Sequence, residues 1–293
     1  MARLADNHRA DDDAPPGAAV TVASSPAHRT PSRPLVFAHR GGRAIGPENT
    51  IAAFDAGMAA GADGLELDVR LSSDGQAMVI HDADLARTTS AAGLVACCTA
   101  AELAMVDAGA RFECEGGFPW RGRGCGVPRL LDVLRRYDAI PIVIEMKDSG
   151  PDLARAVVND IRAAAAAHRV CLAGFDDGAV AEARRLAPEI ATSATREEVR
   201  WVLYRSWVRL PVGSRPPYRA FQLPERSGWL RVISPAFIRT VHRAGCPVQV
   251  WTVNEEADMR RLLAWGVDGL ITDVPALAAR VRDDWARGLT IAG

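Results

Sequence analysis

The feature that most constrains the fold is the alternation of short apolar runs with helical patterns along most of the chain. Helix signals between the runs include SPAFIRTVHRAG, which opens with Ser234 and Pro235 and closes with Gly245. Strands that alternate with helices form a parallel sheet with the helices outside, so eight such units predict a TIM barrel. The eight strands are expected at residues 35–39, 64–70, 141–147, 169–174, 190–194, 219–223, 248–252 and 268–273.

One further apolar run, at 76–81, does not fit this alternation. It follows the second strand across Asp74-Gly75, a strong signal for a tight hairpin turn. The two strands of a hairpin are antiparallel, so this run is not a barrel strand and belongs to an insertion after the second strand. A two-residue loop at Asp74-Gly75 would place His81 directly opposite Asp68, on the same face of the hairpin.

Length and composition are consistent with one barrel-sized domain. The chain has 293 residues, of which 48% are hydrophobic, and its formal net charge is −1, which gives no electrostatic case for binding nucleic acid. No apolar run approaches the roughly 18 residues of a membrane span. We expect a disordered leader at 1–33, a barrel at 34–284 with an insertion at 83–127, and a tail at 285–293. The leader lacks the apolar core of a signal peptide, which favours a cytoplasmic protein.

Four of the six cysteines lie close together, at Cys97, Cys98, Cys114 and Cys125. Their spacing matches no zinc pattern, and two adjacent cysteines are poorly placed for a disulfide. Reduced thiols are therefore expected.

Two pairs of polar residues stand out within the apolar strands. Glu66 and Asp68 are two residues apart and so share one face of their strand, as do Glu145 and Lys147. Buried carboxylates repel one another unless one is protonated or a cation binds, and ligands that are all oxygen suit Mg²⁺ or Ca²⁺. The alternatives are a solvated strand face, or an ion pair with Lys147 or Arg70.

Two histidines flank this acidic group. His39 ends the first strand and is followed by Arg40, and His81 ends the hairpin. Alone, His39 would more simply be a structural histidine. Together with a metal, Arg40 and Lys147, the pair suits a phosphodiester, because cations bind the phosphate oxygens and histidines transfer protons.

Several motifs occur in an order and spacing that resemble one known family: HRGG, PENTIAAF, GLELDVRLSSDG, VIHD, IEMK, VWTVN and GLITD. They are similar to those of the glycerophosphodiester phosphodiesterases, which are relatives of the phosphatidylinositol-specific phospholipases C. The resemblance covers about residues 35–280 and implies a TIM barrel with a hairpin after its second strand.

The resemblance also implies roles for individual residues. It implies one divalent cation, Mg²⁺ or Ca²⁺, and a small glycerophosphodiester as substrate, which would give sn-glycerol 3-phosphate and an alcohol. His39 is then expected to be the base and His81 the acid. The implied metal ligands are Glu66, Asp68 and Glu145, the catalytic residues are His39 and His81, and the substrate-binding residues are Arg40, Lys147 and Trp251.

Two other functions stay open. One is a phospholipase that acts on intact lipid, favoured by the aromatic and basic stretch at 197–210, which could lie on a membrane. The simpler interpretation is that Trp201, Tyr204 and Trp207 pack on the sheet. The other function is a phosphodiester-binding module without catalysis, against which the two histidines argue.

Overall fold

The computed structural model describes residues 33–174, 177–208, 210–212 and 216–288. All of the predicted leader except Arg33 lies outside the described residues, as does the end of the predicted tail. The helix before that tail runs to Ala286, slightly past the predicted boundary at 284.

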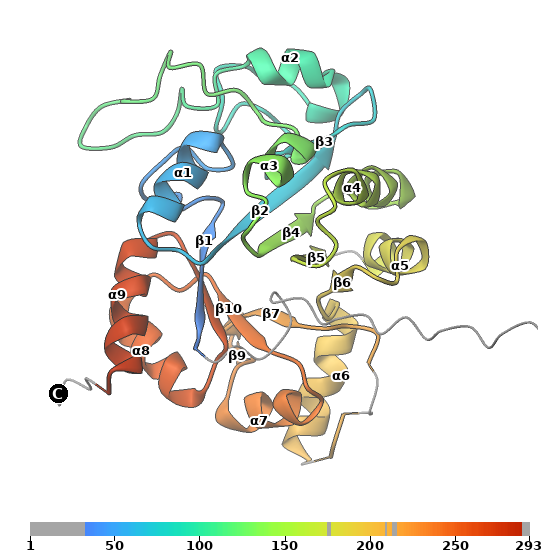
Figure 1. Cartoon of the computed structure of the whole chain (residues 1–293), viewed down its shortest axis with the longest axis vertical. Coiled ribbons are helices and arrows are strands. Elements are labelled where there is room, and N and C mark those ends of the chain that lie inside the picture. The colour runs from blue at the N-terminus through green and yellow to red at the C-terminus, as the bar shows by residue number, and fades with distance from the viewer. Residues whose placement is uncertain (1–32, 175–176, 209, 213–215, 289–293) are drawn as a thin grey trace, which may run out of the picture.

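Eight parallel strands curl into a barrel (Figure 1). Around the sheet the order is β6-β5-β4-β2-β1-β11-β10-β7, and a parallel bridge between Ser193 and Ala220 links the two end strands. The predicted TIM barrel is confirmed. The barrel strands are β1 (Leu35–His39), β2 (Gly64–Leu71), β4 (Ile142–Met146), β5 (Val170–Gly174), β6 (Ala191–Thr192), β7 (Phe221–Pro224), β10 (Val248–Trp251) and β11 (Gly269–Thr272).

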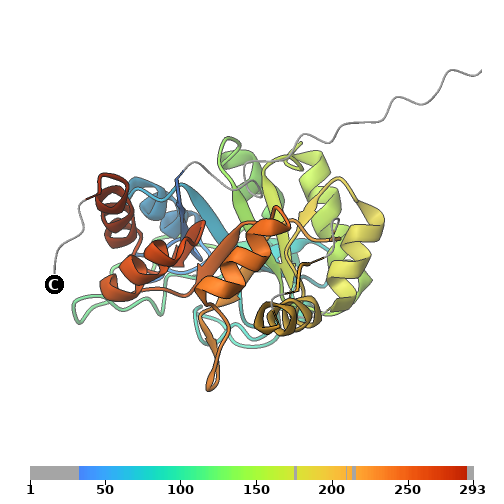
Figure 2. The same cartoon turned by 90° about the horizontal axis from the view of Figure 1, so that it is seen from below.

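Helices cover the outside of the barrel (Figures 1 and 2). Their ends follow the local signals, since Ser234 accepts a hydrogen bond from the amide of Phe237, and Gly266 ends its helix in the left-handed conformation. The outer helices are α1 (Ile51–Ala59), α3 (Leu130–Arg136), α4 (Pro151–Ala163), α5 (Asp177–Leu186), α6 (Arg196–Trp207), α7 (Pro235–Arg243), α8 (Glu256–Trp265) and α9 (Pro275–Ala286).

The predicted hairpin is present, but its register differs by one residue. Strand β3 (Ala77–Val79) pairs antiparallel with β2. The amide of Ser72 donates to the carbonyl of Gln76 (3.0 Å), so the loop has three residues and Gly75 adopts a φ of +75°. Ile80 rather than His81 therefore bonds to the backbone of Asp68 (3.0 Å), and the predicted opposition of His81 and Asp68 is wrong.

The segment after the hairpin has its own small apolar core. It contains η2 (Val95–Cys97) and α2 (Ala100–Met105), and the side chains of Leu85, Val95 and Leu103 pack there against the hairpin residue Met78. All six cysteines carry free thiols, as expected.

The prediction that the aromatic residues of 197–210 pack on the sheet is wrong. Trp201 is 57% exposed, Tyr204 is 55% exposed and Trp207 is 61% exposed. Val202 and Leu203 are the residues of α6 that face the core. Among the described residues, no helix combines the length and apolar character needed to cross a bilayer.

Candidate active site

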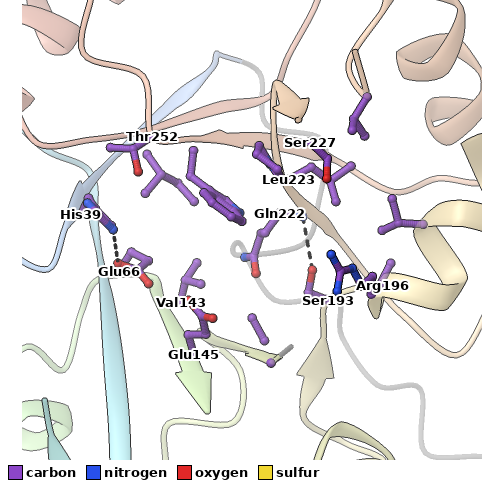
Figure 3. A pocket seen from close by; sticks show the side chains of 18 of the residues that line it. His39, Glu66, Val143, Glu145, Ser193, Arg196, Gln222, Leu223, Ser227 and Thr252 are labelled. Carbon is purple, nitrogen blue, oxygen red and sulfur yellow. Dashed lines mark hydrogen bonds and ion pairs between the residues drawn. The ribbon is translucent and has the colours of Figure 1, made fainter. Parts of the chain in front are cut away.

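A cavity of about 640 Å³ opens where the barrel strands end at their carboxyl termini (Figure 3). This is the end at which TIM barrels carry their active sites. Of the predicted site residues, only Asp68 does not line the cavity, because it lies fully buried behind it. The predicted residues that line it are His39, Arg40, Glu66, His81, Glu145, Lys147 and Trp251.

The three predicted carboxylates come together. Glu66 and Asp68 lie on β2, and Asp68 is paired in register with Glu145 on β4. One oxygen from each lies within 4.8 Å of the other two. Burial, with the charge of Asp68 beside it, raises the pKa of Glu66 to about 8, and burial also raises the pKa of Glu145. Burial and the neighbouring negative charge thus disfavour the ionised carboxylates, and a bound cation would relieve this.

Two cationic side chains adjoin the same carboxylates. Lys147 Nζ lies 3.0 Å from Asp68 Oδ1 and 2.9 Å from Glu145 Oε2, and Arg40 Nε lies 3.0 Å from Asp68 Oδ2. The sequence analysis left an ion pair with Lys147 or Arg70 as an alternative to metal binding. The ion pair between Lys147 and these carboxylates is present. It is absent for Arg70, whose guanidinium contacts Asp148 and the carbonyl of His81.

The donor set fits a hard divalent cation. It consists of carboxylate oxygens alone, and the two adjoining cations leave the cluster with a net negative charge when all three acids are ionised. Oxygen ligands of this kind suit Mg²⁺ or Ca²⁺. The cluster can thus hold a metal ion beside the positively charged side chains of Arg40 and Lys147.

The loop after β1 positions Arg40. Arg40 itself has a φ of +51°, and Gly41, with a φ of +90°, lies so close to α1 that a Cβ there would come within 2.7 Å of the carbonyl carbon of Ala53. This tight turn directs the Arg40 guanidinium towards Asp68, and Glu48 holds it with a 2.8 Å contact. The HRGG and PEN motifs therefore serve one local geometry.

His39 is oriented by Asp273, which directly follows the last strand. Its Nδ1 lies 2.7 Å from Oδ1 of Asp273, while its Nε2 faces Glu66 at 3.9 Å. The other oxygen of Asp273 accepts a hydrogen bond from Asn254 (2.8 Å). Burial lowers the pKa of His39, but the bond to Asp273 and the charge of Glu66 outweigh it and raise the pKa above 6.5.

His81 reaches the cavity from just beyond the end of β3. Its Nδ1 lies 2.6 Å from Oδ1 of Asp82, and Arg87 binds the other oxygen of that carboxylate. Burial, aided by the charge of Lys147, lowers the pKa of His81. Asp82 therefore supports the histidine directly.

Three side chains that adjoin the two histidines were not among the predicted site residues. Asp273 directly follows β11 and closes the GLITD motif, and this position at a carboxyl end was a usable signal for a site residue. Asn254 closes the VWTVN motif, but no role was predicted for it. Arg87 carried no signal, because it lies on a loop whose course the local sequence does not reveal.

A TIM barrel whose strand ends carry an acidic cluster, two histidines and two cations defines a class of barrel hydrolases for phosphate esters. The sequence model of the glycerophosphoryl diester phosphodiesterase family matches residues 39–277. The chain therefore belongs to that family, and the resemblance seen in its motifs is confirmed.

Individual relatives agree. A glycerophosphodiester phosphodiesterase of Caldanaerobacter subterraneus is 31% identical over 246 residues, covering 82% of this chain and 94% of the relative. The crystal structure of the glycerophosphodiester phosphodiesterase from Agrobacterium tumefaciens is 28% identical with a TM-score of 0.69, covering 85% and 99%. An Oleispira antarctica phosphodiesterase, solved in complex with the product sn-glycerol-3-phosphate, is 25% identical with a TM-score of 0.67, covering 86% and 97%.

Proposed function

We propose that this enzyme hydrolyses glycerophosphodiesters to sn-glycerol 3-phosphate and an alcohol, with a divalent metal and two histidines. The observation that carries the proposal is the pair of carboxylate-oriented histidines on either side of the acidic cluster. In each histidine a carboxylate holds Nδ1, which leaves Nε2 for proton transfer. Membership of the family supports the substrate class.

Glu66, Asp68 and Glu145 would hold the metal, Mg²⁺ or Ca²⁺, which supplies positive charge to the phosphate when it is bound. Arg40 and Lys147, which already adjoin these carboxylates, would contact the nonbridging oxygens. Trp251 lines the same cavity and would offer its ring to the glycerol.

His39 would take the proton from the glycerol 2-hydroxyl as that oxygen attacks phosphorus. The bond between phosphorus and the oxygen of the leaving alcohol breaks as His81 donates a proton to this leaving oxygen. Water then opens the cyclic phosphate with the proton transfers reversed. Asp273 would stabilise the imidazolium that forms when His39 takes this proton, and Asn254 holds the other Asp273 oxygen. Asp82, which contacts Nδ1 of His81, is shared with Arg87.

A substrate panel tests the proposal. Purified protein is given glycerophosphocholine with Mg²⁺, Ca²⁺, Mn²⁺ or EDTA, and sn-glycerol 3-phosphate is measured. Release that needs metal supports the proposal. Turnover of intact diacyl phospholipid alone would favour a phospholipase instead, and binding of the diester without turnover under any metal would indicate a non-catalytic module.

The catalytic unit is proposed to be residues 34–284, with the leader dispensable. A chain that starts at Pro34 should keep both its activity and its thermal midpoint. A large loss of either would show that residues 1–33 contribute to the barrel.

A further inference from the structure

Arg87 lies in the segment inserted after the hairpin, and its guanidinium joins two carboxylates from different parts of the chain. Nε binds Asp82. Nη1 and Nη2 bind the two oxygens of Glu48 at 2.9 and 2.8 Å. Glu48 lies in the loop after β1 and Asp82 follows β3, so Arg87 connects these two loops. A planar guanidinium has enough donors, in a fixed fork, to hold both carboxylates in one arrangement.

Each of these carboxylates supports a different residue of the proposed mechanism. Asp82 Oδ1 lies 2.6 Å from Nδ1 of His81, the proposed acid. Glu48 Oε1 accepts a hydrogen bond from Nη1 of Arg40 at 2.8 Å, and Arg40 is the proposed ligand of the phosphate. Arg87 therefore lies at the centre of a chain of contacts that runs from the acid to the phosphate site.

Charge holds this chain of contacts together. Burial would raise the pKa of Glu48 and of Asp82, but their hydrogen bonds to Arg87 outweigh burial. With the further help of Arg40 at Glu48 and of His81 at Asp82, each pKa falls to about 2. Both carboxylates are therefore ionised at neutral pH, and the guanidinium between them offsets their negative charge.

A short turn with buried anchors holds Arg87 in place. Leu85 is buried in the small core of the insertion, and Thr89 is buried as well. The amide and the hydroxyl of Thr89 donate to the carbonyl of Leu85 at 3.0 and 2.9 Å, which closes the turn around Arg87. Arg87 does not line the cavity, and neither do Asp82 and Glu48. Any part that Arg87 has in the reaction is therefore exerted through the side chains that it holds.

We propose that Arg87 is a positioning residue that aligns both the proton donor for the leaving alcohol and the cation that binds the phosphate. It acts on His81 through Asp82, and on Arg40 through Glu48. The proposal rests on the proposed function, because that reaction defines both roles. The bonds that form and break are unchanged, since Arg87 only holds the two side chains in one arrangement before the substrate binds.

Two quantities report the two effects of Arg87. The first is the leaving-group ratio: the rate of alcohol release from a nitrophenyl diester that keeps the glycerol 2-hydroxyl, divided by the rate from glycerophosphocholine, each in a single turnover. Nitrophenol leaves without an acid, so this ratio rises when His81 is misplaced. The second is the dissociation constant of sn-glycerol 3-phosphate, measured by calorimetry at a fixed Mg²⁺ concentration. It rises when Arg40 is misplaced, because a charged donor to the phosphate is lost.

In Arg87→Gln both quantities should rise by about tenfold, because each carboxylate loses hydrogen bonds to a charged group. Arg87→Lys keeps the charge but lacks the fork, so it should resemble Arg87→Gln and not the wild type. Arg162→Gln is the matched control. The side chain of Arg162 is 49% exposed, close to the 46% of Arg87, and it pairs with Glu189 without lining the cavity. Both quantities should stay at their wild-type values in this control.

Variants of the two carboxylates separate the two effects. Asp82→Asn should raise the leaving-group ratio alone, and Glu48→Gln should raise the dissociation constant alone. If Arg87→Gln changes only one of the two quantities, or neither, Arg87 does not hold both side chains and the proposal is overturned. Wild-type values of both quantities in Arg87→Lys would also overturn it, because charge without the fork would then be sufficient.

The activity of the wild type separates this proposal from the proposed function. If the wild type hydrolyses glycerophosphocholine and Arg87→Gln matches it in both quantities, the positioning role is refuted while the proposed function stands. If the wild type hydrolyses no diester, the proposed function fails, and the role assigned to His81 fails with it. In that case, an affinity for sn-glycerol 3-phosphate that is unchanged in Arg87→Gln would refute the link to Arg40 independently.

Discussion

His39 and Asp273 lie 234 positions apart in the chain, yet their side chains meet at 2.7 Å. The first and last strands of the barrel are neighbours, and the register that pairs Ala38 with Thr272 brings the two following residues to the same point. Closure of the barrel therefore creates the histidine–carboxylate pair on which the proposed proton transfer depends.

Asp273→Asn should lower kcat by about 10²–10⁴-fold, because an amide can neither stabilise the imidazolium nor impose the same tautomer on His39. Steady-state kinetics with glycerophosphocholine measure the effect. Asp152→Asn, on the exposed start of α4, is the control and should be near wild type. An Asp273 variant with kcat unchanged would show that His39 needs no orienting carboxylate.

Removal of the metal should abolish activity, and Mg²⁺ or Ca²⁺ should restore it, because the three carboxylates repel one another without a cation. Glu145→Gln should weaken metal binding by at least about tenfold in a calorimetric titration. Glu189→Gln, an acid on the opposite part of the surface paired with Arg162, is the matched control. Full activity after exhaustive chelation would contradict the assignment of this cluster.

His39→Ala and His81→Ala should each cost about 10²–10⁴ in kcat, and the double variant should lose far less than the product of the two. A nitrophenyl diester that keeps the glycerol 2-hydroxyl has a leaving group that needs no acid. With this nitrophenyl diester, the kcat of His81→Ala should recover much more than the kcat of His39→Ala. Equal rescue of both variants would refute the assignment of base and acid.

The contact between His242 and Asp268 should make stability depend on pH. Nε2 of His242 lies 2.7 Å from Asp268, and this hydrogen bond raises the pKa of His242 above 6.5 despite partial burial. The protonated form therefore favours the folded state: its contribution is fully present below about pH 6.5 and is lost as pH rises through the folded-state pKa.

Urea unfolding of the wild type and His242→Gln measures this contribution. The difference in free energy of unfolding between them should be larger at pH 6 than at pH 9. His168→Gln, on the loop after α4, serves as the control. A difference that does not change with pH would mean that this contact contributes no linked proton.

Trp201→Ala and Trp207→Ala should each change the free energy of unfolding by about 1 kcal/mol or less, because both side chains are mostly exposed. Phe237→Ala should cost about 3–5 kcal/mol, since Phe237 is fully buried and packs edge-on against Phe221. Urea denaturation measures both. A large loss in the tryptophan variants would place these rings in a packed interface after all.

Much of the site could be predicted from sequence because its key residues are set by local periodicity. Glu66 and Asp68 share a strand face by the two-residue repeat, and strand order places Glu145 next to them in a parallel barrel. The motif series then linked His39, His81, Arg40 and Lys147 to the same site.

The tertiary structure alone decided features that depend on loops and on long-range packing. The turn at Gly75 uses three residues, so His81 reaches the cavity from beyond its strand instead of across the hairpin. The exposed side of α6 was not predictable, because a mixed aromatic and basic pattern does not reveal which face meets the sheet.

The sequence by itself thus determined the barrel and the acidic cluster, because alternation and i, i+2 spacing act over a few residues, while the resemblance of its motifs pointed to the two histidines. The closure of β1 against β11 brought Asp273 to His39. The packing of α6 beside the barrel end completed the lining of the cavity. Such contacts join residues far apart in the chain, and their geometry follows from the packing of whole elements rather than from any local pattern.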